Sequence, residues 1–106
     1  MDYEKTFYGG ILLDGDELIR NNIYHNIEIE YYKIAKELKT LFHGKKKTYG
    51  IEVVMREYVN NEMKIEEEKI ISLTRNEEIV EKILKKLKEN AVTPTTLNDV
   101  ITDMFY

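Results

Sequence analysis

The chain of 106 residues has no cysteine, a single proline and no uninterrupted apolar run longer than three residues. Without cysteine there is no disulfide, no thiolate ligand for zinc or an iron–sulfur cluster, and no thiol nucleophile. A membrane-spanning helix needs about 20 apolar residues in a row, so none is expected. The N-terminus lacks the basic start and apolar segment of a secretory signal, which predicts a cytoplasmic protein.

Hydrophobic residues make up 42% of the sequence and charged residues 34%. The first fraction is too high for a disordered chain, and the second is too high for a membrane protein. The length is typical of one domain. We expect an N-terminal segment of uncertain structure over residues 1–26 and a single small domain over residues 27–106.

Acidic residues outnumber basic ones, which gives a net charge of −4. Nucleic-acid binding draws its affinity from neutralised phosphates, so this chain would need a local basic patch. The lysines of residues 45–47 and 82–88 are the two clusters available, and their patterning is typical of solvated surface. A nucleic-acid partner is therefore not expected.

Residues 75–89 have the clearest pattern, that of an amphipathic helix. Glutamates lie early and lysines late in the segment, so both ends complement the helix dipole. Thr74 and Glu77 have the spacing of a capping box, and Asn90 is suited to a left-handed C-cap. The apolar stripe consists of Ile79, Val80, Ile83, Leu84 and Leu87.

A second helix is predicted over residues 94–105, with Thr93 as N-cap and Pro94 at its first position. Its apolar stripe consists of Leu97, Val100, Ile101 and Met104. Because only a short turn separates the two helices, we expect them to pack as a helical hairpin or corner.

A β-hairpin is predicted over residues 49–73, with Asn60 and Asn61 as a two-residue turn. The pairs that this register brings together are Glu57–Lys64, Glu52–Lys69, Ile51–Ile70 and Tyr58–Met63. Opposite charges and apolar side chains thus face each other. The glutamates of residues 66–68 interrupt the alternation, which predicts a bulge or an edge position there.

The sequence does not determine the secondary structure of two segments. Residues 27–42 fit helical spacing better than strand alternation, although both are present. Residues 7–13 are compatible with a short strand interrupted by Gly9 and Gly10. Asp14 begins either a short capped helix or, with Gly15, a hairpin turn.

No reactive constellation stands out. His25 and His43 lack a metal-ligand partner at helical spacing, and the sequence from Asp14 fails the calcium-loop pattern. Ser72 is not in a nucleophile elbow, and adjacent glutamates on regular elements point apart. We therefore predict no catalytic residue, no metal site and no cofactor.

Residues 90–101 resemble the turn and second helix of the helix-turn-helix found in repressor DNA-binding domains. The matching positions are Val92, Thr93, Thr95, Thr96, Leu97, Val100 and Ile101. However, Leu87 stands where the first helix usually has a small residue, and Asp99 and Asp103 would repel phosphates. DNA binding is therefore the alternative, and a plain pair of packed helices is the main interpretation.

Motifs along the chain also resemble a family of small uncharacterised bacterial proteins. These motifs are Tyr49-Gly50-Ile51-Glu52-Val53, Ile71-Ser72, and a lysine- and glutamate-rich helix that ends in Asn90-x-Val92-Thr93-Pro94-x-x-Leu97-x-Asp99-Val100-Ile101-x-Asp103. The resemblance spans residues 31–104 and implies a strand over residues 31–39. It implies no site, because no activity is assigned to that family.

The sequence thus predicts an α+β fold, in which a three-stranded antiparallel meander carries two C-terminal helices on one face. The predicted core is Ile51, Val53, Met55, Ile71, Leu73, Ile79, Val80, Ile83, Leu84, Leu87, Leu97, Val100 and Ile101. An open sheet edge and the tyrosines near both ends favour an interaction surface. We predict a non-enzymatic protein-interaction or regulatory module that binds another protein or itself, with a DNA-binding regulator as the alternative.

Overall fold

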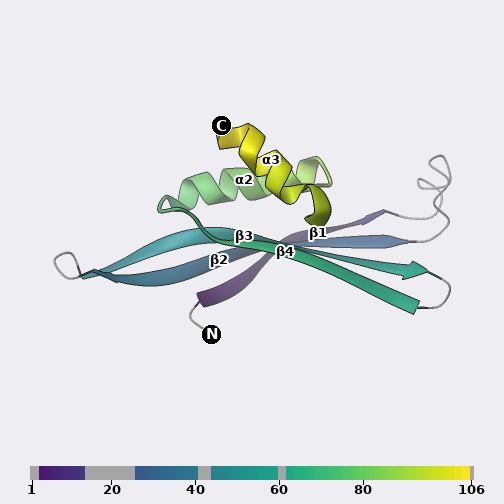
Figure 1. Ribbon diagram of the computed structural model, residues 1–106, viewed down its shortest axis with the longest axis horizontal. Coiled ribbons are helices and arrows are strands. Elements are labelled where there is room, and N and C mark those ends of the chain that lie inside the picture. The colour runs from purple at the N-terminus through teal and green to yellow at the C-terminus, as the bar shows by residue number, and fades with distance from the viewer. Residues whose placement is uncertain (1–2, 14–25, 41–43, 60–61, 106) are drawn as a thin grey trace.

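The computed structural model describes residues 3–13, 26–40, 44–59 and 62–105, which form four strands followed by helices (Figure 1). The strands are β1 (Tyr3–Leu13), β2 (Ile27–Thr40), β3 (Gly44–Val59) and β4 (Glu62–Thr74). The helical elements are α2 (Glu77–Glu89), the 3₁₀ turn η2 (Pro94–Thr96) and α3 (Leu97–Phe105). The predicted α+β class is therefore confirmed. None of the helices in these ranges is long and apolar enough to cross a membrane.

The sheet is an antiparallel meander in the order β1-β2-β3-β4, and both helices lie on the same face (Figure 1). The prediction of three strands is wrong, because β1 pairs with β2 as a fourth strand. The register shifts between Phe7 and Gly9, so a bulge at Tyr8 lets the strand continue through the two glycines. In the sequence, the two glycines suggest the end of a strand. In the structure, a β-bulge in this edge strand allows the strand to continue past them.

The predicted hairpin register is confirmed, with Glu57 opposite Lys64 and Ile51 opposite Ile70. The turn residues 60–61 lie outside the described residues. For residues 66–68 the sequence predicted either a bulge or an edge position. No register shift occurs there, and β4 is an edge strand, so the second of these predictions is correct. The shift lies instead at Gly50, where an added Cβ would stand 1.9 Å from the carbonyl oxygen of Ile70. A bulge at this point needs a residue without a side chain.

Residues 27–40 form strand β2, so the helix favoured by periodicity is wrong. Ile27, Ile29 and Tyr31 alternate onto the helix-covered face and are all buried there. β2 pairs along its whole length with β3 and over most of it with β1. Pairing on both sides outweighs the local helical spacing, because strand preference depends mainly on tertiary context.

Helix α2 begins two residues later than predicted. Its N-cap is Asn76, whose side-chain oxygen accepts hydrogen bonds from the backbone N–H groups of Glu78 and Ile79. The expected cap, Thr74, instead accepts a hydrogen bond from the backbone N–H of Asn76. Thr74 is still part of β4, so the helix begins after Asn76, another residue type that is favoured as an N-cap.

The C-terminus of α2 is closed by Ala91 and not by a left-handed Asn90. Asn90 has φ −102°, whereas Ala91 has φ 49°. The N–H of Ala91 donates to the carbonyl of Lys88, and the N–H of Val92 donates to that of Leu87. These two bonds form a Schellman motif, in which the left-handed position follows the C-cap.

The second predicted helix starts as η2 and continues as α3. Thr93 has the extended backbone of an N-cap, but its side chain caps no backbone N–H group. Its carbonyl oxygen accepts the N–H of Thr96, and Pro94 occupies the first position, buried against the sheet. Pro94 fits here because the first turn leaves its N–H position without a partner.

The core lies between the helices and one face of the sheet. Most of the predicted core is buried or packed against it, but Ile79 is 39% exposed and Ile71 lies outside the cluster. The core residues that the sequence prediction missed come from β2 and from the turn after α2. They are Ile27, Ile29, Tyr31 and Val92.

Candidate functional site

No described helix covers the second face of the sheet (Figure 1). Successive side chains of a strand point to opposite faces, so the register assigns each residue to one of them. Where the four strands run together, this uncovered face carries Tyr3, Lys5, Phe7, Gly10, Leu12, Glu28, Glu30, Tyr32, Ile34, Lys36, Thr48, Gly50, Glu52, Val54, Arg56, Tyr58, Met63, Ile65, Glu67 and Lys69. We call this set the open face.

One half of the open face is closed by its own side chains. The ammonium group of Lys5 lies 2.7 Å from a carboxylate oxygen of Glu52 and 4.5 Å from the ring centre of Tyr32. Phe7 packs edge-on against Tyr32, with 5.6 Å between ring centres. The carboxylate of Glu52 is almost fully buried, and the ion pair with Lys5 supplies the partner that a buried charge needs.

The two edge strands also meet across this half. The ammonium group of Lys69 on β4 donates a 2.9 Å hydrogen bond to the hydroxyl of Tyr3 on β1. This hydrogen bond raises the pKa of Lys69. Ile34 is completely buried here although no described helix packs on it. The network of side chains thus fixes the shape of this half of the face.

The other half of the open face is apolar and exposed. Leu12, Tyr58, Met63 and Ile65 are each between 48% and 57% exposed, and we call these four residues the apolar patch. Tyr58 lies directly opposite Met63 in the β3–β4 register. Most of the large exposed hydrophobic side chains in the described ranges belong to the open face, and only Ile79 and Phe105 belong to the helices.

The charges of the open face balance, although the chain as a whole carries −4. Acidic and basic residues are equal in number: Glu28, Glu30, Glu52 and Glu67 against Lys5, Lys36, Arg56 and Lys69. Arg56 also forms an ion pair with Glu30 beside the apolar patch. The face therefore offers apolar area without an excess of charge.

Sequence reasoning missed this surface, although one signal for it was present. The hairpin register pairs Ile51 with Ile70 and Tyr58 with Met63. Positions 51 and 58 differ by an odd number, so their side chains lie on opposite faces of the strand. Two apolar pairs on opposite faces indicate that the second face is not simply polar.

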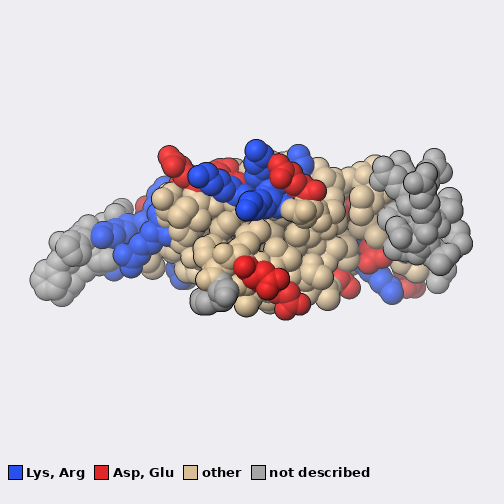
Figure 2. All heavy atoms as spheres, turned by 90° about the horizontal axis from the view of Figure 1, so that it is seen from above, with Lys and Arg blue, Asp and Glu red and all other residues tan. Residues whose placement is uncertain are grey.

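The helix-covered side of the molecule carries the lysines that were considered for nucleic acid. Lys82, Lys85, Lys86 and Lys88 are exposed on α2, and Figure 2 shows basic and acidic groups side by side on this surface. Lys33 of β2 donates hydrogen bonds to Glu81 and Glu77 of α2, which raise its pKa, chiefly through Glu81. These contacts tie α2 to the sheet.

The segment that resembles a helix-turn-helix supplies the core with Val92, Leu97 and Ile101 and exposes Asp99 and Asp103. Lys46 and Lys47, expected in a loop, are exposed residues of β3. DNA binding stays a prediction, and no contact among the described residues favours it.

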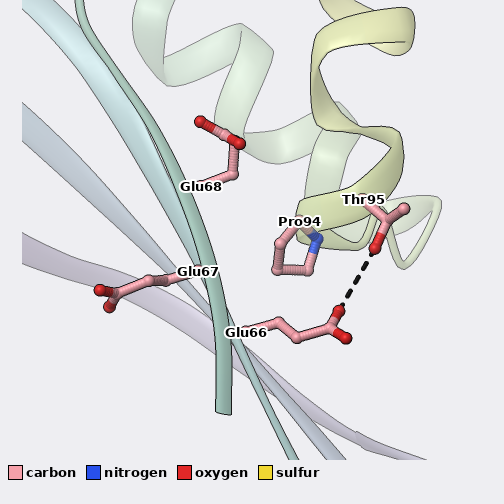
Figure 3. A pocket seen from close by; sticks show the side chains of 5 residues that line it. All are labelled: Glu66, Glu67, Glu68, Pro94 and Thr95. Atoms are coloured by element: carbon pink, nitrogen blue, oxygen red, sulfur yellow. Dashed lines mark hydrogen bonds between the residues drawn. The ribbon is translucent and has the colours of Figure 1, made fainter.

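A shallow hollow between β4 and η2 is lined by three glutamates, Pro94 and Thr95 (Figure 3). The hydroxyl of Thr95 donates a 3.3 Å hydrogen bond to Glu66, while Glu67 points to the other side of the strand (Figure 3). Over the described ranges, no group of three or more His, Asp or Glu side chains could hold a metal ion. His25, His43 and the segment from Asp14 lie outside these ranges.

Comparison with known proteins gives a family but no activity. No curated protein and no solved structure matches the chain. A family of unknown function (DUF6514) matches residues 15–106, which include the motifs that resemble an uncharacterised family. This chain therefore belongs to DUF6514, a family of unknown function.

Proposed function

We propose that this protein is a non-enzymatic protein-interaction module whose binding surface is the open face of its sheet. The observation that carries the proposal is the apolar patch, in which Leu12 of β1 and three side chains of β3 and β4 are about half exposed on one face. Monomeric proteins rarely expose contiguous apolar patches of more than a few hundred Å², and larger ones mark interaction sites. Tyrosine and methionine, both present here, are enriched at such interfaces.

The rest of the open face supports the same function. Several of its charged side chains are already paired with one another, as Lys5 is with Glu52 and Arg56 is with Glu30. A partner therefore meets fewer isolated charges, each of which would be costly to desolvate. The strands are already paired, so binding at this face does not have to order the backbone.

Photo-crosslinking in the cells that produce the protein tests this proposal. A photoreactive phenylalanine at position 58 places the probe in the apolar patch, and the same probe at position 79 reports on the exposed Ile79 of α2. We expect protein adducts from position 58 that disappear when Ile65→Arg is added, and none from position 79. No adduct from position 58, or the same adducts from both positions, would contradict the proposal.

A further inference from the structure

We infer that the open face binds a second copy of this chain, packed face to face about a two-fold axis that runs along the strands between β2 and β3. This inference rests on the proposed function, because it uses the same surface. Two sheets packed face to face lie about 10 Å apart. This axis places β1 of one copy over β4 of the other, and β2 over β3. Residues of the two copies that face each other lie at the same position along the strands.

The register shows what this exchange brings together at the level of the apolar patch. Leu12, Glu28, Arg56 and Ile65 form one row across the four strands. The two-fold axis places Leu12 over Ile65 of the partner subunit. It also places Glu28 over Arg56 of the partner subunit. Within this row, apolar side chains therefore face apolar side chains, and a carboxylate faces a guanidinium group.

The neighbouring rows fit the same exchange. One row is Gly10, Glu30, Val54 and Glu67, and the next is Phe7, Tyr32, Glu52 and Lys69. In the first, Gly10 leaves room for Glu67 of the partner subunit. In the second, Phe7 lies over Lys69 of the partner subunit, an aromatic ring beneath a cation. No like charges meet in any of the three rows.

The size of the face suits a stable dimer. Four strands at about 4.8 Å spacing and about ten residues at about 3.3 Å each give a footprint of about 600 Å². Specific interfaces bury about 800 Å² on each partner, and the side chains of a twisted sheet add to the flat footprint. The apolar patch and Phe7 provide large exposed hydrophobic side chains on β1, β3 and β4 for such an interface to bury.

The edge of the sheet is a poorer site for a second copy. β4 is an edge strand, and antiparallel pairing of two β4 strands centred on Glu67 would set the glutamates of residues 66–68 of the two copies opposite one another. Like charges directly opposite one another destabilise a strand pair. This pairing at the β4 edge is therefore disfavoured, whereas the charges of the open face balance.

The mass in solution is the first test, measured by sedimentation equilibrium of the full chain at micromolar to submillimolar concentrations. We expect twice the monomer mass of 12.6 kDa. Ile65→Arg should raise the dimer dissociation constant at least about 30-fold, because the two-fold axis makes the substitution remove the apolar contact with Leu12 twice. Ile79→Arg is the matched control on α2 and should leave the dimer unchanged; circular dichroism checks that both variants fold.

A charge exchange tests the proposed axis. Glu28→Arg alone faces basic against basic in the dimer, and Arg56→Glu alone faces acid against acid, so each variant should dimerise more weakly than the wild type. An equimolar mixture of the two should form a heterodimer, because each new charge then meets its opposite on the other chain. Restored contacts within one chain cannot produce this result.

The outcomes separate the inference from the proposed function. A wild-type protein that stays monomeric overturns the inference, and so does a dimer that Ile65→Arg leaves intact. A mixture of the charge variants that forms no heterodimer overturns the proposed axis. Crosslinks from position 58 to a different protein, together with a monomeric mass, overturn self-association but support the proposed function.

Discussion

The hydroxyl of Tyr31 donates a 2.9 Å hydrogen bond to the carbonyl oxygen of Val92, 61 positions later in the chain. Tyr31 is completely buried, and Val92 is 6% exposed. The bond joins the central strand β2 to the turn that follows α2. It therefore fixes where the helical layer sits on the sheet.

Tyr31→Phe should lower the free energy of unfolding by about 1–3 kcal/mol. The variant keeps the buried ring but leaves the carbonyl of Val92 without its partner, and an unsatisfied buried acceptor costs about this much. Urea denaturation followed by circular dichroism measures the change. Tyr32→Phe is the matched control, because its hydroxyl bonds only to the half-buried Glu30 and its loss should cost less. Equal losses for the two variants would contradict the role of the buried bond.

The same tyrosine makes stability depend on alkaline pH. Burial raises the pKa of Tyr31 to about 12 from an ordinary value of about 10. Because the folded pKa is the higher one, its contribution is complete below about pH 10 and is lost as the pH rises through about 12. At about pH 11 the loss attributable to this group is about 1 kcal/mol. Wild type and Tyr31→Phe, compared at neutral and alkaline pH, should converge in stability; parallel curves would refute the assignment.

Ala91→Gly should stabilise the protein by about 1 kcal/mol. Ala91 has φ 49°, a conformation that costs a residue with a Cβ about 1–2 kcal/mol and glycine almost nothing. Thermal unfolding measures the gain as a higher Tm. At the adjacent position, Asn90→Gly relieves no strain and removes the side-chain bond to the carbonyl of Lys86, so it should destabilise. A lower Tm for Ala91→Gly would count against the left-handed turn.

Gly50→Ala should destabilise the protein by about 3 kcal/mol, at the upper end of overpacking effects. The new methyl group would stand 1.9 Å from the backbone carbonyl oxygen of Ile70, which cannot move without breaking the pairing of β3 with β4. Gly9→Ala is the control, since its methyl group would meet only the flexible side chain of Lys88 at 3.3 Å. Chemical denaturation measures the free energy of unfolding of both variants. An unchanged free energy for Gly50→Ala would disprove the bulge.

Duplex DNA should not bind the wild-type protein in a salt-dependent way. Glutamates flank the exposed lysines of α2 on both sides in the sequence, and Asp99 and Asp103 are exposed on α3. Fluorescence anisotropy with short duplexes at low ionic strength measures binding directly, because phosphate contacts are strongest there. Binding that disappears on reversal of Lys82, Lys85 and Lys86 would instead support the DNA-binding alternative.

Local signals in the sequence predicted the elements that local chemistry determines. The β3–β4 register follows from a two-residue turn and facing charges, and α2 follows from its stripe and its ends. Strand β2 could not be predicted in this way, because the spacing of its apolar residues fits both a helix and a strand. Its pairing with β1 and β3 determines that it forms a strand. For β1 the sequence allowed only a short strand interrupted by Gly9 and Gly10, because a propensity pattern does not reveal the bulge that lets a longer strand continue through them.

The open face was missed for a related reason. Its apolar residues are interspersed with charged ones along every strand, as Leu12 and Ile65 are with Glu28 and Arg56 in one row. A strand pattern with charges on one side indicates a solvent-facing surface. Only the register across four strands shows that these opposite charges lie side by side and that apolar side chains are exposed around them.

The meander order of the sheet has a kinetic consequence. Every strand pairs with its neighbour in sequence, so each pairing closes a comparatively short loop. The bond from Tyr31 to Val92 instead closes 61 residues and carries the larger entropic cost. Contacts between nearby residues form fastest, which favours a folding route in which the hairpins zip together first and the helical layer docks last.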